Sequence, residues 1–131
     1  MNLKELQEDL KNDAKIAGIT YDISLYECAV DKDTEYLYEQ KLDNEEIDRS
    51  EYDLIIKLRD DFFDKHKMSQ VSYFNTGNYG DPYYHVNIVY KTDKDLHFKI
   101  SYQYDSYDSN EYNENWISEV TPVQEVKIRF R

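Results

Sequence analysis

The chain has 131 residues, and its 28 Asp and Glu outnumber its 16 Lys and Arg, so its formal net charge is −12. Nucleic-acid phosphates and anionic membranes repel this charge, so we expect direct binding to neither and favour a cationic partner. The length fits a single domain over 1–131, and the 40% of hydrophobic residues are enough to build its core.

Tyrosine and cysteine usage narrows the class of protein further. The 14 Tyr outnumber the 5 Phe, and because a buried hydroxyl needs a partner, we expect many tyrosine rings to lie half exposed. Cys28 is the only cysteine, which leaves no internal disulfide. Residues 1–15 lack the apolar stretch of a signal peptide, and no apolar run is long enough to span a bilayer. The sequence therefore predicts a cytoplasmic protein.

Apolar residues at helical spacing predict two helices. The first covers 3–17. The second begins at an S-x-x-D capping box formed by Ser50 and Asp53, and it ends near 65–67. We expect its apolar stripe, which includes Phe62, to face the core.

Alternating apolar and polar residues predict the strands. Two of them form a hairpin before the second helix, and the others follow that helix. A polar, Tyr-rich loop at 105–115 precedes the last strand. The order αββαβββ(loop)β predicts an α+β fold in which two helices pack on one face of an antiparallel sheet of five to six strands. The predicted strands cover 19–25, 35–42, 71–75, 84–90, 96–104 and 126–130.

The segment QYDSYDSNEYNENW at 103–116 is the most distinctive part of the sequence. Its carboxylates recur at every third residue with aromatic rings between them, and no Lys or Arg occurs between Lys99 and Lys127. Carboxylates bind Lys and Arg, and aromatic rings serve as rigid anchors. The alternative is a solvated loop whose charges prevent aggregation. We expect a partner-binding surface formed by Tyr104, Asp105, Tyr107, Asp108, Glu111, Tyr112, Glu114 and Trp116.

A second acidic stretch, over 31–64, holds 13 carboxylates. Several of them lie near the start of the second helix, where the helix dipole favours negative charge. We therefore interpret this stretch as a solvated face of the fold.

The sequence shows no motif of a metal site or an enzyme. His85 and His97 are predicted on neighbouring strands, where they could face each other, but two imidazoles make an incomplete zinc site. The chain contains no nucleophile elbow, P-loop or HExxH motif. We therefore expect no metal, no cofactor and no catalytic activity.

An acidic cytoplasmic domain of this size, rich in Tyr, Asp and Glu, resembles the immunity proteins (antitoxins) of bacterial contact-dependent and polymorphic toxin systems. Within that class, the layout from DLIIKLRDDF at 53–62 to FKISYQYD at 98–105 is similar to that of the YezG-like nuclease antitoxins. The N-terminal hairpin and the basic final strand depart from that layout. The resemblance implies tight binding of a cognate toxin, commonly a nuclease, inside the producing cell.

Our leading interpretation is therefore a protein inhibitor that covers or distorts a basic toxin. One alternative is a DNA-mimicking antirestriction or regulatory protein, in which carboxylates would follow one long face as phosphates do. Another alternative is a small-ligand-binding or enzymatic α+β domain, whose sheet would curl around an enclosed pocket lined by tyrosines. The sequence leaves open the identity of the toxin, the mode of inhibition and the oligomeric state.

Overall fold

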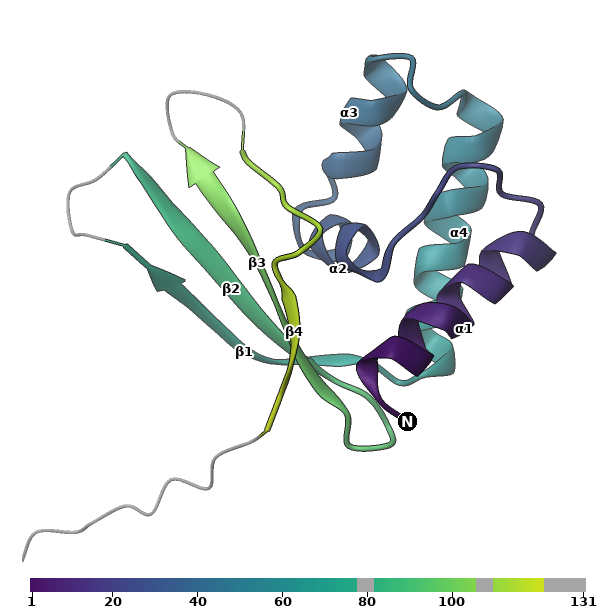
Figure 1. Cartoon of the computed structure of the whole chain (residues 1–131). Helices are drawn as coiled ribbons and strands as arrows, with labels where there is room; N and C mark the ends of the chain where they lie inside the picture. The colour runs from purple at the N-terminus through teal and green to yellow at the C-terminus, as the bar shows by residue number, and fades with distance from the viewer. Residues whose placement is uncertain (78–81, 106–109, 122–131) are drawn as a thin grey trace, which may run out of the picture.

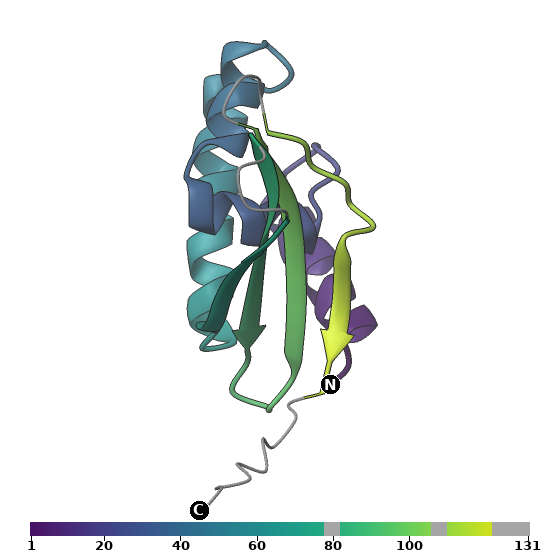
Figure 2. The same cartoon turned by 90° about the vertical axis from the view of Figure 1, so that its left-hand side faces the viewer.

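The computed structural model has an α+β fold, in which four helices cover one face of a four-stranded antiparallel sheet (Figure 1). The structure describes residues 1–77, 82–105 and 110–121, and these counts refer to that part of the chain. In Figure 2 the sheet lies in front of the helices, and its other face carries no helix of the described residues. The elements are α1 (Leu3–Ile16), α2 (Leu25–Thr34), α3 (Leu37–Asp43), α4 (Arg49–Lys65), β1 (Ser69–Thr76), β2 (Tyr83–Lys91), β3 (His97–Asp105) and β4 (Ile117–Val120).

Helices α1 and α4 confirm the two predicted helices. Each begins at a polar cap and buries one apolar stripe. A reciprocal capping box at Asn2 begins α1. Helix α4 begins earlier than predicted, since the side chain of Asp48 caps its first turn. The proposed box at Ser50 and Asp53 therefore lies inside the helix. Phe62 is buried, as its place on the stripe predicted.

The predicted N-terminal hairpin is wrong, because the chain forms α2 between the two expected strands and α3 in place of the second. Residues 19–24 form no strand and lead into α2. Every residue from Leu25 to Asp31 is buried, since α2 lies between the sheet and the other helices (Figure 1). A helix that is buried on all sides shows no amphipathic period. Helix α2 ends at Glu35, whose left-handed backbone (φ 57°) turns the chain toward α3.

The sheet follows the prediction for its first three strands and differs in the last. Strands β1 to β4 are neighbours in chain order, and each pair is antiparallel. Strand β4 was not predicted, because four residues are too few to show an alternating pattern. The expected strand at 126–130 lies outside the described residues. The described sheet therefore has four strands, not five to six.

Among the described residues, Tyr21, Tyr52, Tyr84 and Tyr112 are partly buried, as expected. Four other tyrosines (Tyr26, Tyr38, Tyr90 and Tyr102) lie in the core and find partners for their hydroxyls there. Tyr26 donates to the carbonyl of Ser101 at 2.6 Å, and Tyr90 donates to the carbonyl of Ala29 at 3.2 Å. These bonds attach α2 to the central strands, where burial of a hydroxyl would otherwise be unfavourable.

Cys28 is fully buried on α2. Its sulfur lies 3.4 Å from the hydroxyl oxygen of Tyr38. Burial raises the pKa of this thiol to about 12.

The core also holds one ion pair, between Asp31 on α2 and Arg59 on α4, and both side chains are buried. The backbone N–H of Tyr38 donates to the same carboxylate at 3.0 Å. This network joins α2, α3 and α4. Within the described residues, no helix has both the length and the apolar character needed to cross a membrane.

Candidate partner-binding site

The structure places the predicted binding residues on two sides of the sheet. Tyr104 and Asp105 end β3, and the segment 110–116 returns along the same strand (Figure 1). Tyr107 and Asp108 lie outside the described residues. Because successive residues of a strand point to opposite faces, neighbours along this stretch lie on different sides of the sheet.

Two of the predicted residues lie on the face that the helices cover. Tyr104 stacks on Tyr84 with 4.9 Å between the ring centres, and Tyr112 packs against Tyr102 at 5.9 Å. Tyr104 remains exposed at the end of this face. The pairs form a row of aromatic rings next to the end of the helical layer.

The other face holds a different subset. Trp116 contacts His85 edge to face, with 5.1 Å between the ring centres. Glu111 and Gln103 pair across an isolated bridge with two backbone hydrogen bonds of 2.9 Å, so their side chains share a face. Asp105 lies two residues after Gln103 on β3, on the same face as Gln103. The expected single surface is therefore divided.

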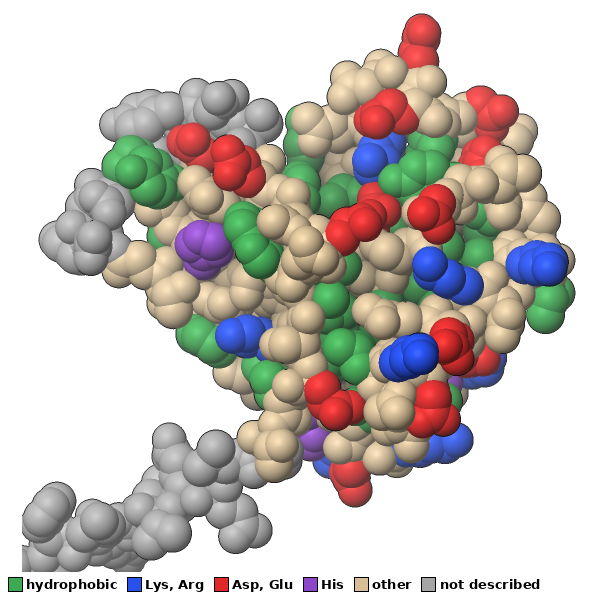
Figure 3. All heavy atoms as spheres, in the orientation of Figure 1, with side chains coloured by type: hydrophobic (Ala, Val, Ile, Leu, Met, Phe, Trp, Pro, Cys, Tyr) green, Lys and Arg blue, Asp and Glu red, His purple; other side chains and the backbone are tan. Residues whose placement is uncertain are grey.

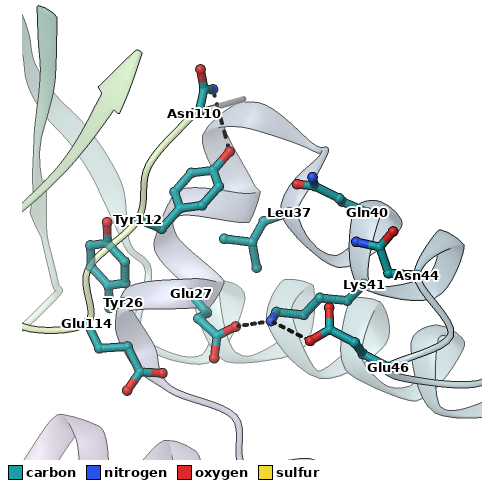
Figure 4. Close-up of a pocket in the computed structure, with 10 residues that line it drawn as sticks. All are labelled: Tyr26, Glu27, Leu37, Gln40, Lys41, Asn44, Glu46, Asn110, Tyr112 and Glu114. Atoms are coloured by element: carbon teal, nitrogen blue, oxygen red, sulfur yellow. Dashed lines mark hydrogen bonds and ion pairs between the residues drawn. The ribbon is translucent and has the colours of Figure 1, made fainter. Parts of the chain in front are cut away.

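A pocket of about 390 Å³ lies between α2, α3 and the segment 110–114 (Figure 4). The predicted residues Tyr112 and Glu114 form one wall. Sequence reasoning missed most of the remaining lining, because α2 was not predicted and α3 was expected to be a strand. The missed residues with charge or a ring are Tyr26, Glu27, Lys41 and Glu46.

Glu27 is the most unusual residue of this pocket, because the residue is only 5% exposed and yet lines the open pocket. It occupies the first turn of α2, where Ser24 caps the helix. One of its oxygens accepts a hydrogen bond from the hydroxyl of Tyr21 at 2.8 Å. The sequence Ser24-Leu25-Tyr26-Glu27 is itself an S-x-x-E capping-box signature, so a signal for α2 was present.

Electrostatics around Glu27 oppose its negative charge. Burial is the largest influence and raises the pKa of Glu27, and the nearby carboxylate of Glu114 raises it further. The hydrogen bond from Tyr21 and the charge of Lys41 act in the opposite direction without cancelling the rise. The pocket therefore holds a carboxylate whose charge is incompletely compensated.

Lys41 shows how the pocket accommodates a cation. Its ammonium nitrogen lies 3.7 Å from Glu27 and 4.0 Å from Glu46, and it sits over the ring of Tyr21 at 5.6 Å. Figure 4 shows the three charged side chains converging, with Glu114 on the opposite wall. Carboxylates beside an aromatic face are the surroundings that bind ammonium and guanidinium groups.

The wall that carries Glu114 is held in place by polar contacts. The hydroxyl of Tyr26 accepts a hydrogen bond from the backbone N–H of Asn113 at 3.2 Å. Burial raises the pKa of Tyr26 to about 12, so this hydroxyl stays protonated at neutral pH. The segment is therefore fixed to the core at the point where the pocket opens.

Some carboxylates of the acidic stretch over 31–64, which was expected to be a solvated face, make contacts within the fold. Asp33 accepts the hydroxyl of Tyr102 at 2.9 Å, and Asp60 pairs with Lys32 at 3.0 Å. On the face in Figure 3, acidic side chains surround a basic one near α3 and alternate with Lys and Arg toward α1. This face does not carry the continuous row of carboxylates that a DNA mimic would need.

His85 and His97 do not face each other. His85 pairs with Gln103, whereas His97 pairs with Lys91 at the other end of β2. Within the described residues, no group of three or more His, Cys, Asp or Glu could hold a metal ion.

Comparison with known proteins adds no relative. No family model, no curated protein and no solved structure matches the chain.

Proposed function

We propose that this chain is a protein inhibitor of the immunity type, which binds and neutralises a toxin with a basic surface, such as a nuclease, inside the cell that makes both. The observation that supports this proposal best is the buried carboxylate of Glu27 at the floor of an acidic, open pocket. In this proposal a Lys or Arg side chain of the toxin enters the pocket between Glu27 and Glu114.

The energetic argument starts from the environment of Glu27. A carboxylate removed from water is unfavourable unless hydrogen bonds and opposite charge compensate it. Tyr21 and Lys41 supply part of this compensation. A guanidinium or ammonium group from a partner would supply the remainder through short, charge-assisted hydrogen bonds. Removing one partner of such a buried charge pair weakens binding more than removing an exposed charge does, because the other charge stays buried and unpaired.

The outer part of the interface would act differently from its centre. Glu111 and Glu114 are exposed, and the chain carries a net charge of −12, so they would attract a basic toxin before contact. Tyr104 offers a rigid ring at the same end of the sheet. In this proposal the exposed carboxylates speed association with the toxin, whereas Glu27 and the aromatic anchors slow its dissociation.

The test needs a basic toxin domain, to be sought in the gene next to the one that encodes this chain. It compares Glu27→Gln and the double variant Glu111→Gln/Glu114→Gln with Asp93→Asn as a matched control. Asp93 is exposed in the turn between β2 and β3, at the other end of the sheet. Glu27→Gln should raise the dissociation rate by at least tenfold, which corresponds to about 1.4 kcal/mol. The double variant should slow association and reduce its salt dependence, and the control should change neither rate.

If the chain neither binds the toxin nor inhibits it, the proposal is wrong. If inhibition persists unchanged in all variants, another surface makes the contact.

A second candidate is a small cationic ligand, because the volume of the pocket falls within the range of ligand sites. The pocket does not lie inside a curled sheet, as the sequence-based alternative required, but between helices and a loop segment. Titration with a diamine such as putrescine distinguishes this candidate. The small-ligand function would be favoured if the chain binds the diamine at micromolar concentration, loses this binding in Glu27→Gln and does not bind the toxin.

A further inference from the structure

Strand β1 forms one edge of the sheet, and its outer side has no partner strand in the described chain. All eight residues of β1 are exposed. Three are large and apolar or aromatic: Val71 is 50% exposed, Tyr73 is 49% exposed and Phe74 is 42% exposed. In Figure 2 the helices lie behind the sheet, and β1 is the strand on the side away from β4.

The composition of β1 contrasts with that of the rest of the chain. Charged residues make up 34% of the sequence, yet SQVSYFNT contains no Asp, Glu, Lys or Arg, and no Pro or Gly. The other three described strands each contain at least one charge. Natural edge strands usually carry charges, Pro or distortions that prevent further pairing. Strand β1 lacks the first two and is rich in residues that favour strands.

We propose that β1 pairs in an antiparallel manner with β1 of a second copy, so that the two sheets become continuous. This inference does not depend on the proposed inhibitory function. An uncharged strand favours neither a basic nor an acidic partner, and another uncharged strand pairs with it without leaving a charge at the junction. The same strand in a second copy meets this condition, and two-fold pairing is the commonest form of self-association.

The geometry of β1 locates the centre of the pairing. The register with β2 shifts between Gln70 and Ser72, and such a bulge disturbs pairing at the start of the strand. Residues 72–76 continue in regular register. A two-fold axis at Phe74 would place this ring opposite its own copy, as a cross-strand aromatic pair, and would keep the helices of both copies on the same side.

Salt should distinguish this contact from toxin binding. Each copy carries a net charge of −12, so two copies repel each other at low ionic strength. Because β1 itself is uncharged, salt weakens this repulsion without weakening the contact. Self-association should therefore increase with salt, whereas binding of a basic toxin should decrease.

The experiment measures molar mass by sedimentation equilibrium at about 0.05 M and about 0.5 M NaCl over a range of concentrations. We expect the mass to rise from 15.8 kDa toward twice that value, and to rise further at the higher salt. Phe74→Lys and Ser72→Lys, both at exposed positions, should remain at the monomer mass. Ile16→Lys is the matched control, because Ile16 is 85% exposed at the end of α1, and it should associate as the wild type does.

Hydrogen exchange locates the contact. Amides of β1 should become protected as the concentration rises, and those of β4 should not. A wild type that stays monomeric under all conditions overturns the proposal, as does equal association of all variants. If the chain is monomeric and Phe74→Lys weakens toxin binding, a strand of the toxin occupies this edge, and the proposal is wrong.

Discussion

Glu27 and Asp31 lie one turn apart on α2, and both carboxylates are almost completely buried, but their surroundings differ. Asp31 pairs with Arg59 and accepts the backbone N–H of Tyr38, so its partners all belong to the core. Glu27 has the hydroxyl of Tyr21 at 2.8 Å, the hydroxyl of Ser24 at 3.5 Å, the ammonium of Lys41 at 3.7 Å and an open pocket. Burial alone therefore does not reveal the role of a charge. The partners of a buried charge reveal it, because a compensated charge stabilises the fold and an incompletely compensated one is available to bind.

The largest effect on stability is expected at an uncharged core residue, and it gives a reference for the effects at the two carboxylates. Phe62 lies on α4, three residues after Arg59, and is 1% exposed. Phe62→Ala should lower the free energy of unfolding by about 3–5 kcal/mol, because the lost contacts leave a cavity. Urea denaturation monitored by circular dichroism measures this change. A loss below 1 kcal/mol would show that this face of α4 is not central to the core.

Removing Asp31 should be the next most damaging change. Asp31→Asn leaves the guanidinium of Arg59 buried with only Asp60, at 3.0 Å, as an ionic partner. We expect a loss of about 3 kcal/mol, since breaking a buried ion pair from one side is strongly destabilising. The double variant Asp31→Leu/Arg59→Met should recover most of this loss. If Asp31→Asn is as stable as the wild type, the distinction between the two carboxylates fails.

Glu27→Gln should have the opposite sign. Gln keeps an oxygen for the hydroxyl of Tyr21 and removes the penalty of burying charge, so stability near neutral pH should rise by a few tenths to about 1 kcal/mol. The pKa of Glu27 is raised in the folded chain, so wild-type stability falls as the pH rises through that folded value. The gain should therefore shrink toward acid pH. Thermal unfolding between about pH 4 and pH 8 tests this trend.

Asp9 is a third paired carboxylate and is partly exposed, so its removal is expected to have the smallest effect on stability. Burial tends to raise the pKa of Asp9, but hydrogen bonds from Lys65 and His66 outweigh it and lower the pKa. Their nitrogens lie 2.9 Å and 2.7 Å from the carboxylate. Asp9→Asn should therefore cost about 0.5–1 kcal/mol at neutral pH. A lowered folded pKa means that this stability is present above the unfolded value and disappears as the pH falls through the folded one. An unchanged acid-denaturation curve would contradict the assignment.

The elements that sequence periodicity predicted are those with one buried and one wet face. Helices α1 and α4 and strands β2 and β3 each bury one side, so their apolar residues repeat at a recognisable spacing. Helix α2 is buried all round, and the alternation before it at 19–25 was mistaken for a strand. The capping signature at Ser24 and Glu27 was the local signal that could have corrected this error.

The candidate site was only partly predictable for the same reason. Tyr112 and Glu114 were found because their segment is unusual in composition. Glu27 belongs to a helix that was not predicted, and Lys41 belongs to one that was expected to be a strand. Their proximity to Glu114 depends on how α2 and α3 pack against β3. Composition indicates residue types suited to binding, but tertiary packing decides which of them share a pocket.

The single thiol on α2 gives this protein an intrinsic kinetic probe. Cys28 is enclosed by the core, and reagents such as Ellman's reagent attack only an accessible thiolate. Labelling of the native chain therefore requires this part of the core to open, and its rate reports how often that opening occurs. Because Cys28 is the neighbour of Glu27 along α2, a toxin that binds the pocket should slow the labelling without touching the sulfur.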